Sequence, residues 1–343
     1  MKKLILIFAA LCLCACSANN EKLPEDSNGE TPGTEIAQPT KKVVTITAVG
    51  DCTFATDSNA PKDGSFVSEV DKQDNDYTYF LKNVADIFAE DDLTIVNFEG
   101  TLSERGSRAD KQFAFRGKPE YTEILTSSSV EAANLANNHS SDYGSDSYED
   151  TVKNLEEAGI ITFNGTDTKV LDVNGVKVGL VGIYALNETR AKDLEPAMAQ
   201  VKEDGAELII VNVHWGQEGA KVPNSSQRKL AHNAIDLGAD LVLGHHPHVL
   251  QGVEKYDGKY IVYSLGNFCF GGNRNPSDKD TMIFRQTFTL ENGVAEDDDK
   301  IVIYPCSISS VSGRNNYQPT VLEGDEADRV MDKIHERTES IPD

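Results

Sequence analysis

The sequence predicts an α/β fold, because runs typical of strands and of helices alternate along the chain. Residues 43–49 and 208–213 are short and rich in β-branched residues, as buried strands are. Residues 147–158 and 226–237 have helical character and end at a glycine. In folds of this kind, ligands bind beyond the carboxyl ends of the strands. The polar side chains that follow the strands are therefore the candidates for a functional site.

The first half of the globular region places candidate groups after three strands. Asp51 follows the first strand, Glu99 follows the second, and Asn138 and His139 follow the third. An aspartate after a glycine often serves as a turn or cap residue, so Asp51 alone would be weak evidence. The expected elements are strands at residues 43–49, 93–96, 130–136 and 160–163 and helices at residues 77–88, 119–125 and 147–158.

Three histidines follow one strand in the second half. The apolar run 241–243 is broken by Gly244, and His245, His246 and His248 come next. His246 and His248 flank one residue, so both face one pocket if the backbone there is extended. Neutral imidazole is the commonest metal ligand of proteins, although a lone histidine is more often solvated or structural.

The other elements complete the alternation. His214 follows the strand at residues 208–213, and Asn267 follows a strand at residues 260–265. Asn174-Gly175 is a strong hairpin turn signal. The remaining expected elements are helices at residues 196–204, 226–237 and 327–336, an exposed alternating strand at residues 281–290 and a strand at residues 301–304.

Together these groups predict a divalent metal site. Mixed carboxylate, amide and imidazole ligands suit Mn, Fe or Zn, and geometry would choose among them. Two such ions can activate water and stabilise a leaving oxygen. The predicted ligands are Asp51, Glu99, Asn138, His214, His246 and His248.

Composition and charge limit the class of partner. The 343 residues are 39% hydrophobic and 26% charged, which fits a globular body. The formal net charge of -24 repels nucleic acid, which we exclude as a partner, and it opposes a polyanionic substrate at long range. We expect one domain at residues 43–290 and a C-terminal extension, residues 291–343, that packs on it. After export, Cys52, Cys269 and Cys306 give no disulfide framework, although one pair could form.

The N-terminus predicts a lipoprotein. Two lysines precede an apolar segment at residues 4–13, which is short for a membrane span. L-C-A-C at residues 13–16 then resembles a bacterial lipobox, with Cys16 as the lipidated residue; an ordinary secretory signal is the alternative. We expect residues 1–15 to be a signal peptide and residues 16–42 to be a flexible polar tether. Such a protein is held by its lipid on the cell membrane, outside the cytoplasm.

One basic segment, residues 101–118, stands out in this acidic chain. A solvated loop is the default interpretation, and a clamp for an anionic substrate is the alternative. Arginine can hold a carboxylate or phosphate with two hydrogen bonds, and Arg116 is the best candidate for binding substrate. The segment is residues 101–118, with Arg105, Arg108, Lys111, Arg116 and Lys118.

Seven short motifs resemble one family, in the same order. They are G-D at 50–51, N-F-E-G at 97–100, F-R-G-K-P-E-Y at 115–121, L-A-N-N-H at 135–139, H-W-G at 214–216, G-H-H-P-H at 244–248 and S-L-G-N-F at 264–268. The chain is similar there to the CapA family of capsule-synthesis, poly-γ-glutamate proteins, related in fold to calcineurin-like metallophosphoesterases. The resemblance implies a metallophosphatase-like α/β/β/α sandwich. It also implies a link to polyglutamate capsule synthesis, transport or anchoring at the cell envelope.

The resemblance also implies roles for individual residues. His139 matches the group that protonates the leaving group in the phosphoesterases, and Asn138 is the catalytic candidate beside it. His245 and Asn267 lie in two of the motifs, and we expect them to bind substrate. Metallophosphoesterases begin with Asp-x-His, whereas residues 51–53 lack that histidine. The ligand set is therefore altered.

Two functions follow from these expectations. The first is a membrane-tethered, metal-dependent hydrolase that cleaves an amide, peptide or phosphoester bond in an anionic or peptide envelope polymer. The second is a non-catalytic, polymer-binding or scaffold subunit that works with other capsule synthesis proteins. A bound metal without turnover of any envelope substrate would favour the second.

Overall fold

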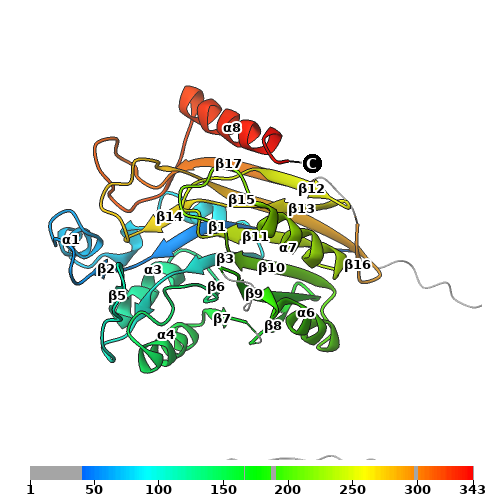
Figure 1. Cartoon of the computed structure of the whole chain (residues 1–343), viewed down its shortest axis with the longest axis horizontal. Helices are drawn as coiled ribbons and strands as arrows, with labels where there is room; N and C mark the ends of the chain where they lie inside the picture. Colours follow the sequence, from blue (N-terminus) through cyan, green and yellow to red (C-terminus); the bar gives the residue numbers. More distant parts are fainter. Residues whose placement is uncertain (1–40, 166, 187–190, 297–299, 343) are drawn as a thin grey trace, which may run out of the picture. The chain divides into compact units, whose positions relative to one another are not determined.

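The computed structural model describes residues 41–165, 167–186, 191–296 and 300–342 (Figure 1). The predicted signal peptide and Cys16 lie outside these ranges, as does the predicted tether up to residue 40. The first strand, β1 (Lys41–Thr53), takes in the last two residues of that tether. Within the described ranges, no helix is long and apolar enough to cross a membrane.

A nine-stranded mixed sheet forms one half of the described fold. Its central strand β1 runs parallel to β3 (Leu93–Phe98) and β14 (Asn267–Phe270) and antiparallel to β15 (Asp280–Glu291). In spatial order the sheet contains β18 (Thr320–Val321), β17 (Ile301–Ser307), β15, β1, β3, β6 (Ala132–Asn134) and β7 (Ile161–Phe163), with β14 beside β1 and β16 (Val294–Ala295) beside β15.

A six-stranded sheet forms the other half. Its middle strands pair in parallel, and β8 and β9 form the predicted hairpin, with positive φ at both Asn174 and Gly175. In spatial order it contains β12 (Val253–Tyr256), β13 (Lys259–Val262), β11 (Leu241–His245), β10 (Leu208–His214), β9 (Val176–Tyr184) and β8 (Lys169–Val173).

Helices cover the outer faces of both sheets, which gives the predicted α/β/β/α sandwich (Figure 1). Between the sheets, Ile46 and Ile95 of one pack in the same core as Ile210 and Leu243 of the other. The larger sheet carries α1 (Phe66–Lys72), η1 (Tyr77–Tyr79), α2 (Ala85–Phe88), η2 (Pro119–Thr122), α3 (Glu123–Thr126) and α4 (Ser145–Glu157). The smaller sheet carries α6 (Leu194–Glu203) and α7 (Ser225–Asp236).

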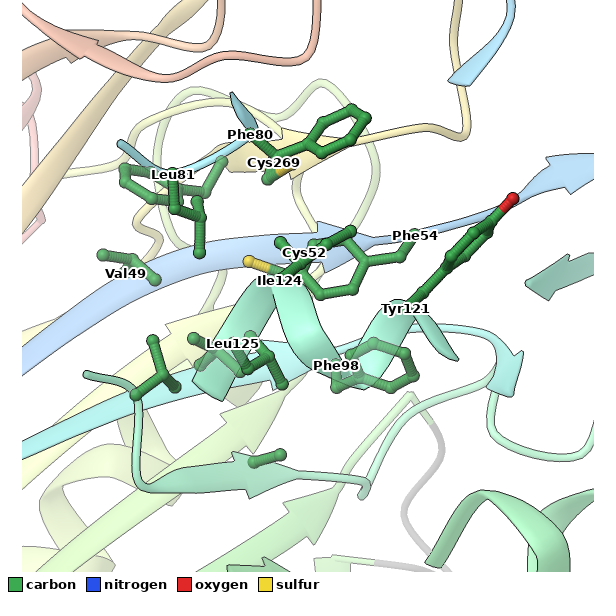
Figure 2. Close-up of a cluster of buried hydrophobic side chains, with 14 of the residues drawn as sticks. Val49, Cys52, Phe54, Phe80, Leu81, Phe98, Tyr121, Ile124, Leu125 and Cys269 are labelled. Carbon is green, nitrogen blue, oxygen red and sulfur yellow. The ribbon is translucent and has the colours of Figure 1, made fainter. Parts of the chain in front are cut away.

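The outer core of the larger sheet is shown in Figure 2. Ile124 and Leu125 of α3 pack toward Cys52 of β1 and Phe98 of β3. This packing buries the strand that carries Asp51 on both faces, so the strand has little freedom to move. Cys52, Cys269 and Cys306 are buried free thiols, so the pair left open by the sequence does not form.

Two sequence predictions about elements differ from the structure. The predicted helix at residues 77–88 is two short pieces, η1 and α2, because Val84 at the start of α2 has a non-helical φ of -129°. Phe80 and Phe88 are both buried, so the apolar spacing indicated burial rather than a continuous helix. The strand predicted as exposed, β15, is largely buried, because it lies between β1 and β17 and packs in the same core as the last helix.

A small third sheet carries the basic segment. It consists of β2 (Thr56–Asp57), β5 (Phe115–Gly117) and β4 (Thr101–Leu102), with β5 in the middle. The basic segment therefore begins in this sheet and ends one residue after its middle strand.

The last helix, α8 (Gly324–Glu339), is attached to β15 by charge, and this attachment is testable. Asp280 is 8% exposed and accepts from Arg329 Nη1 at 2.6 Å and Nη2 at 2.8 Å, and also from Lys333 Nζ. We expect Asp280→Asn to lower the free energy of unfolding at pH 7 by about 2 kcal/mol, because charge-assisted hydrogen bonds to a buried carboxylate are lost. Urea denaturation measures the change. The control is Asp332→Asn, which removes an exposed carboxylate of α8.

The pH dependence of this attachment has a definite sign. Burial raises the pKa of Asp280, but hydrogen bonds from Arg329 and Lys333 outweigh burial and leave that pKa below its usual value. The stabilising contribution is therefore full above the unfolded pKa of about 3.9 and is lost as the pH falls through the lower native pKa. Equal stability of Asp280→Asn and the wild type at pH 7 would contradict the prediction.

Candidate metal centre

Strand register aligns polar side chains at the carboxyl edges of both sheets. In the larger sheet, Asp51 of β1 pairs with Asn97 of β3 and with Asn267 of β14. In the smaller sheet, His214 of β10 pairs with His245 of β11. The two rows meet, since His245 Nδ1 is 3.6 Å from Asp51 Oδ1. The sheets therefore bring together the groups that the sequence places after its strands.

Two glycines allow the backbone to approach closely where the rows meet. A Cβ at Gly50 would lie 1.9 Å from Gly266 O, and a Cβ at Gly244 would lie 2.1 Å from Tyr263 O. Any side chain at either position would force the strands apart. The glycines therefore fix the neighbouring Asp51 and His245.

Asp51 and Glu99 are the buried carboxylates of the cluster, and both are 0% exposed. Asn97 joins them, because its Nδ2 donates to Asp51 Oδ1 at 2.8 Å and to Glu99 Oε1 at 3.2 Å. Asn134 Nδ2 donates to Asn97 Oδ1 at 2.9 Å and so fixes the orientation of that amide. Glu99 Oε2 is buried and has no hydrogen-bond partner among the described residues.

The predicted nitrogen ligands surround these carboxylates. His248 Nδ1 is 2.9 Å from Asp51 Oδ2. His214 Nδ1 is 3.6 Å from Glu99 Oε1, and its Nε2 is 2.7 Å from Asn138 Oδ1. The centroid of the His246 ring lies 4.7 Å from that of His214 and 5.6 Å from that of His248. All six predicted ligands therefore gather in one place.

We call residues 245–248 the histidine loop. Its backbone is not extended, although extended backbone was the expected condition for His246 and His248 to face one pocket. His246 has a φ of 93° and His248 a φ of 57°. Such a conformation costs on the order of 1 kcal/mol or more in a non-glycine residue and persists only where its surroundings hold it. Here His246 N donates to Asp51 Oδ2 at 3.4 Å, and Asn267 Nδ2 donates to His248 O at 3.1 Å. The rings still converge, because both residues turn.

The protonation states of two of the histidines and the high pKa of Glu99 suit a cation. Burial lowers the pKa of His246 to about 4 and the pKa of His214 well below its usual value, so both rings are neutral at pH 7 and present lone pairs. Burial, and then the charge of Asp51, raises the pKa of Glu99 well above its usual range. A cation would relieve this cost. One ligand atom each from Asp51, Glu99 and His248 lie within 4.8 Å of one another. The residues therefore fit a divalent metal.

His139 lies beside the cluster with its own partner. Its Nδ1 is 2.7 Å from Asp142 Oδ2, which makes Nδ1 the protonated nitrogen and leaves Nε2 to exchange a proton. Lys111 Nζ donates to Asp142 Oδ1 at 2.6 Å and to Asn138 O at 2.9 Å. The Phe115 ring packs on His139, with centroids 4.5 Å apart. Burial lowers the pKa of His139, although Asp142 opposes the shift.

Two predicted substrate residues are buried within the cluster. His245 is 1% exposed, and its Nε2 is 3.3 Å from Asn212 Oδ1. Asn267 is 4% exposed, and its Oδ1 is 3.0 Å from His248 Nδ1. Both side chains are buried against polar neighbours, and their predicted role in binding substrate stays a prediction.

Two arginines of the basic segment have partners within the protein. Arg108 Nη2 donates to Asp57 Oδ2 at 2.7 Å. Arg116 donates to the carbonyl of Arg105, and its guanidinium lies 3.6 Å from the centre of the Tyr143 ring. The predicted role of Arg116 in binding substrate stays a prediction, and its guanidinium would have to leave these contacts to perform it.

Four residues of the site were not predicted from the sequence: Asn97, Asn134, Asp142 and Glu218. Asn97 and Asn134 end or nearly end buried strands, and an amide in that position is a usable signal. Asp142 follows His139 by three residues, a spacing that permits the pairing seen. Glu218 offers a ligand atom within 4.8 Å of those of His246 and His248. It lies two residues after H-W-G, and no spacing or periodicity connects it to the site.

The fold and the site define a metallophosphatase-like α/β protein with a candidate metal centre where its two sheets meet. Residues 45–272 match the family described as bacterial capsule synthesis protein PGA_cap, and the chain belongs to that family. This confirms the resemblance to CapA proteins that the motifs carry.

Individual relatives agree with this assignment. The capsule biosynthesis protein CapA of Bacillus anthracis is 32% identical over 270 residues, which cover 69% of this chain and 63% of that protein. The PGA biosynthesis protein CapA of Bacillus subtilis (strain 168) is 33% identical over 232 residues, 60% of each chain. A probable polyglutamine synthesis accessory protein of Mycobacterium tuberculosis is 28% identical over 51% of this chain and 55% of that protein. The matched region spans less than two thirds of each relative.

Among solved structures, a hypothetical protein from Thermus thermophilus aligns with a TM-score of 0.46 and 16% identity, over 76% of this chain and 98% of that chain.

Proposed function

We propose that this chain is an envelope-anchored, metal-dependent hydrolase that acts on a polymer during capsule or poly-γ-glutamate production. One observation carries the proposal: two fully buried carboxylates share a site with neutral imidazoles, and Glu99 Oε2 and His246 Nδ1 have no hydrogen-bond partner among the described residues. Buried polar atoms of a purely structural cluster are normally paired. Atoms that serve as ligands of a cation are left unpaired until the cation binds. The names of the relatives supply the capsule and polyglutamate context.

The residues of the site divide the work between holding a cation and moving a proton. A divalent cation, when bound, supplies Lewis-acid polarisation and a nucleophile from water at neutral pH. Asn97 orients both carboxylates, and Asp142 holds His139 through Nδ1, so that Nε2 can take a proton from the attacking water and pass it to the leaving group. The cation would be held by Asp51, Glu99, Asn138, His214, His246 and His248.

The substrate is an anionic or peptide envelope polymer, and the bond is an amide, peptide or phosphoester. The basic segment offers little attraction to a polyanion, because Arg108 and Lys111 are paired with buried carboxylates. With a net charge of -24, the protein would therefore attract an anionic polymer mainly through the cation itself. A peptide substrate would not meet this barrier.

A hydrolysis assay on the full chain tests the proposal. The protein is loaded with Mn, Fe or Zn and offered poly-γ-glutamate, peptidoglycan stem peptides and a phosphodiester, and released amine or phosphate is measured. We expect turnover of one class that a chelator abolishes and that added metal restores. Turnover that ignores the chelator would contradict the proposal.

A non-catalytic role is the second candidate. The mycobacterial relative is named as an accessory protein, which favours a polymer-binding or scaffold subunit that works with other capsule synthesis proteins. Binding of polymer with metal present, but without cleavage of any of the three substrate classes, would select this role.

The location of the protein depends on its N-terminus. Because L-C-A-C at residues 13–16 follows a short apolar segment, we expect Cys16 to carry lipid after removal of residues 1–15. Cys16→Ser should move the protein from the membrane fraction to the soluble fraction or stall its processing, as immunoblotting of fractions would show. Cys14→Ser is the matched control and should leave the protein in the membrane fraction. An unmodified Cys16 on the mature wild type, found by mass spectrometry, would refute the prediction.

A further inference from the structure

An exposed phenylalanine lies at the outer end of a row of aromatic rings that begins at the candidate metal centre. The Phe115 ring packs on His139 with centroids 4.5 Å apart, and the Phe113 ring stacks on Phe115 with centroids 6.4 Å apart and planes 9° apart. Phe115 is 3% exposed, whereas Phe113 is 46% exposed. The row therefore leads from a proposed catalytic residue to the surface.

A second ring joins this row from the histidine loop. The centroid of the Phe270 ring lies 5.0 Å from that of His248 and 6.4 Å from that of Phe115, which it meets edge to face. Gly272 leaves room for this contact, because a Cβ there would lie 2.6 Å from Phe270 Cζ and 2.9 Å from Phe115 Cζ. Rings that pack on His139 and on His248 thus converge on Phe115, against which Phe113 stacks.

One ion pair holds the backbone on both sides of Phe113. Arg108 Nη2 donates to Gln112 O at 3.2 Å, and Ala114 N donates to Asp57 Oδ2 at 2.8 Å. Arg108 and Asp57 also bind each other, with 2.7 Å between Nη2 and Oδ2. A ligand that stacks on a ring already held in place orders less of the protein when it binds. The pair therefore fixes an exposed apolar ring that contributes little to the core.

The surroundings of Phe113 favour an uncharged ligand. The face of an aromatic ring carries partial negative charge and attracts the C–H groups of a flat partner. A sugar ring offers such a face and keeps its hydroxyl groups in water, so it needs no buried polar partner. An anionic polymer is opposed by the net charge of -24. Three cations of the basic segment are already paired with carboxylates: Arg105 with Asp150, Arg108 with Asp57 and Lys111 with Asp142.

We infer that Phe113 is a stacking subsite for an uncharged sugar unit of the envelope polymer. The inference rests on the proposed function and names a substrate class for it, a polymer that contains neutral sugar close to the bond that is cleaved. Phe115 supports the subsite and connects it to His139. The Arg108–Asp57 pair positions it.

Binding of neutral tetrasaccharides to the full chain tests the inference. The N-acetylglucosamine tetramer, cellotetraose and maltotetraose are titrated by isothermal titration calorimetry, and saturation-transfer difference NMR identifies the sugar protons that touch the protein. We expect one of them to bind through one face of a sugar ring. Phe113→Ala should weaken that binding about tenfold, and Phe113→Tyr should retain it, because the aromatic face is kept. Val302→Ala is the matched control, since Val302 of β17 is also 46% exposed, and it should change nothing.

Two comparisons decide what occupies the ring. A neutral peptide and poly-γ-glutamate are titrated beside the sugars, and every titration is repeated on protein freed of metal with a chelator. Sugar binding should persist without metal, because stacking needs no cation. Binding that disappears with the metal would overturn the inference. So would a peptide or polyglutamate affinity that depends on Phe113 while no sugar affinity does.

The outcomes separate this inference from the proposed hydrolase. Sugar binding that depends on Phe113 supports the inference even if no bond is cleaved, and it then belongs to a polymer-binding subunit. Metal-dependent turnover by a wild type that binds none of the tetrasaccharides, or binds them equally well as Phe113→Ala, would overturn the inference and leave the hydrolase proposal intact.

Discussion

Asp51→Asn should abolish retention of metal by the protein and remove the effect of a chelator on its melting temperature. Asp51 contributes a fully buried carboxylate that Asn97 and His248 orient, and an amide in its place carries no charge to balance a divalent ion. In the wild type, removal of a metal present at 100-fold excess over its dissociation constant should cost about 2.7 kcal/mol of apparent stability. For a domain of this size that is a fall of roughly 5 °C.

The measurement combines elemental analysis with thermal denaturation in the presence and absence of chelator. Asp280→Asn is the matched control, because it also removes a buried carboxylate, but one that is paired with cations of α8. We expect it to lower the melting temperature while keeping both the metal and the response to chelator. A wild type that takes up none of Mn, Fe or Zn, and melts at the same temperature with chelator, would show that the cluster is not a metal site.

The parts of the site that could be predicted are those that depend on local sequence alone. Asp51 and His214 each follow an apolar, β-branched run, and such a run is buried as a strand whatever its neighbours are. Parallel pairing then brings strand ends to one edge, so the positions of these two residues follow from the pattern of strands and helices. The motif resemblance added the prediction of a sandwich and the order in which the ligands of the two sheets follow along the chain.

The parts that could not be predicted depend on register and on loop conformation. Asn97 becomes the partner of Asp51 only because β3 pairs with β1 in one register, with an irregularity before Asp51. His246 and His248 adopt positive φ, which no local propensity favours. Arg108 pairs with Asp57 across 51 positions of sequence, and so one arginine of the basic segment is neutralised by a residue that a local reading does not associate with it.

Glu218 also shows that contacts between loops cannot be predicted from local sequence. Its place in the sequence predicts an exposed loop residue, and it is exposed. Its relation to His246 and His248 arises from one backbone hydrogen bond between two loops, Gly219 N to Pro247 O. Contacts of this kind have no sequence signal, because they depend on where two strands end relative to each other.

His139→Ala should reduce turnover of the substrate by about 10²–10⁴-fold while metal content stays the same. The Nδ1 of His139 is held by Asp142, and its Nε2 is the nitrogen from which a proton can reach a leaving group. In the proposed site His139 is not among the groups that hold the cation, so its loss should lower kcat and leave the metal in place. Steady-state kinetics on the substrate class found by the hydrolysis assay, with elemental analysis of the same preparation, measure both quantities.

Two further variants make this last prediction specific. Asp142→Asn keeps the imidazole but weakens its orientation, so it should lower kcat less than His139→Ala does and again leave the metal bound. His335→Gln, an exposed histidine of α8, should change neither kcat nor metal content. If His139→Ala loses its metal, then His139 is a ligand and the division of labour drawn here is wrong. If His139→Ala keeps both its metal and full turnover, the proton must come from another group. Lys111 is then the next residue to replace, because its Nζ donates to Asp142 and to Asn138 O beside the cluster.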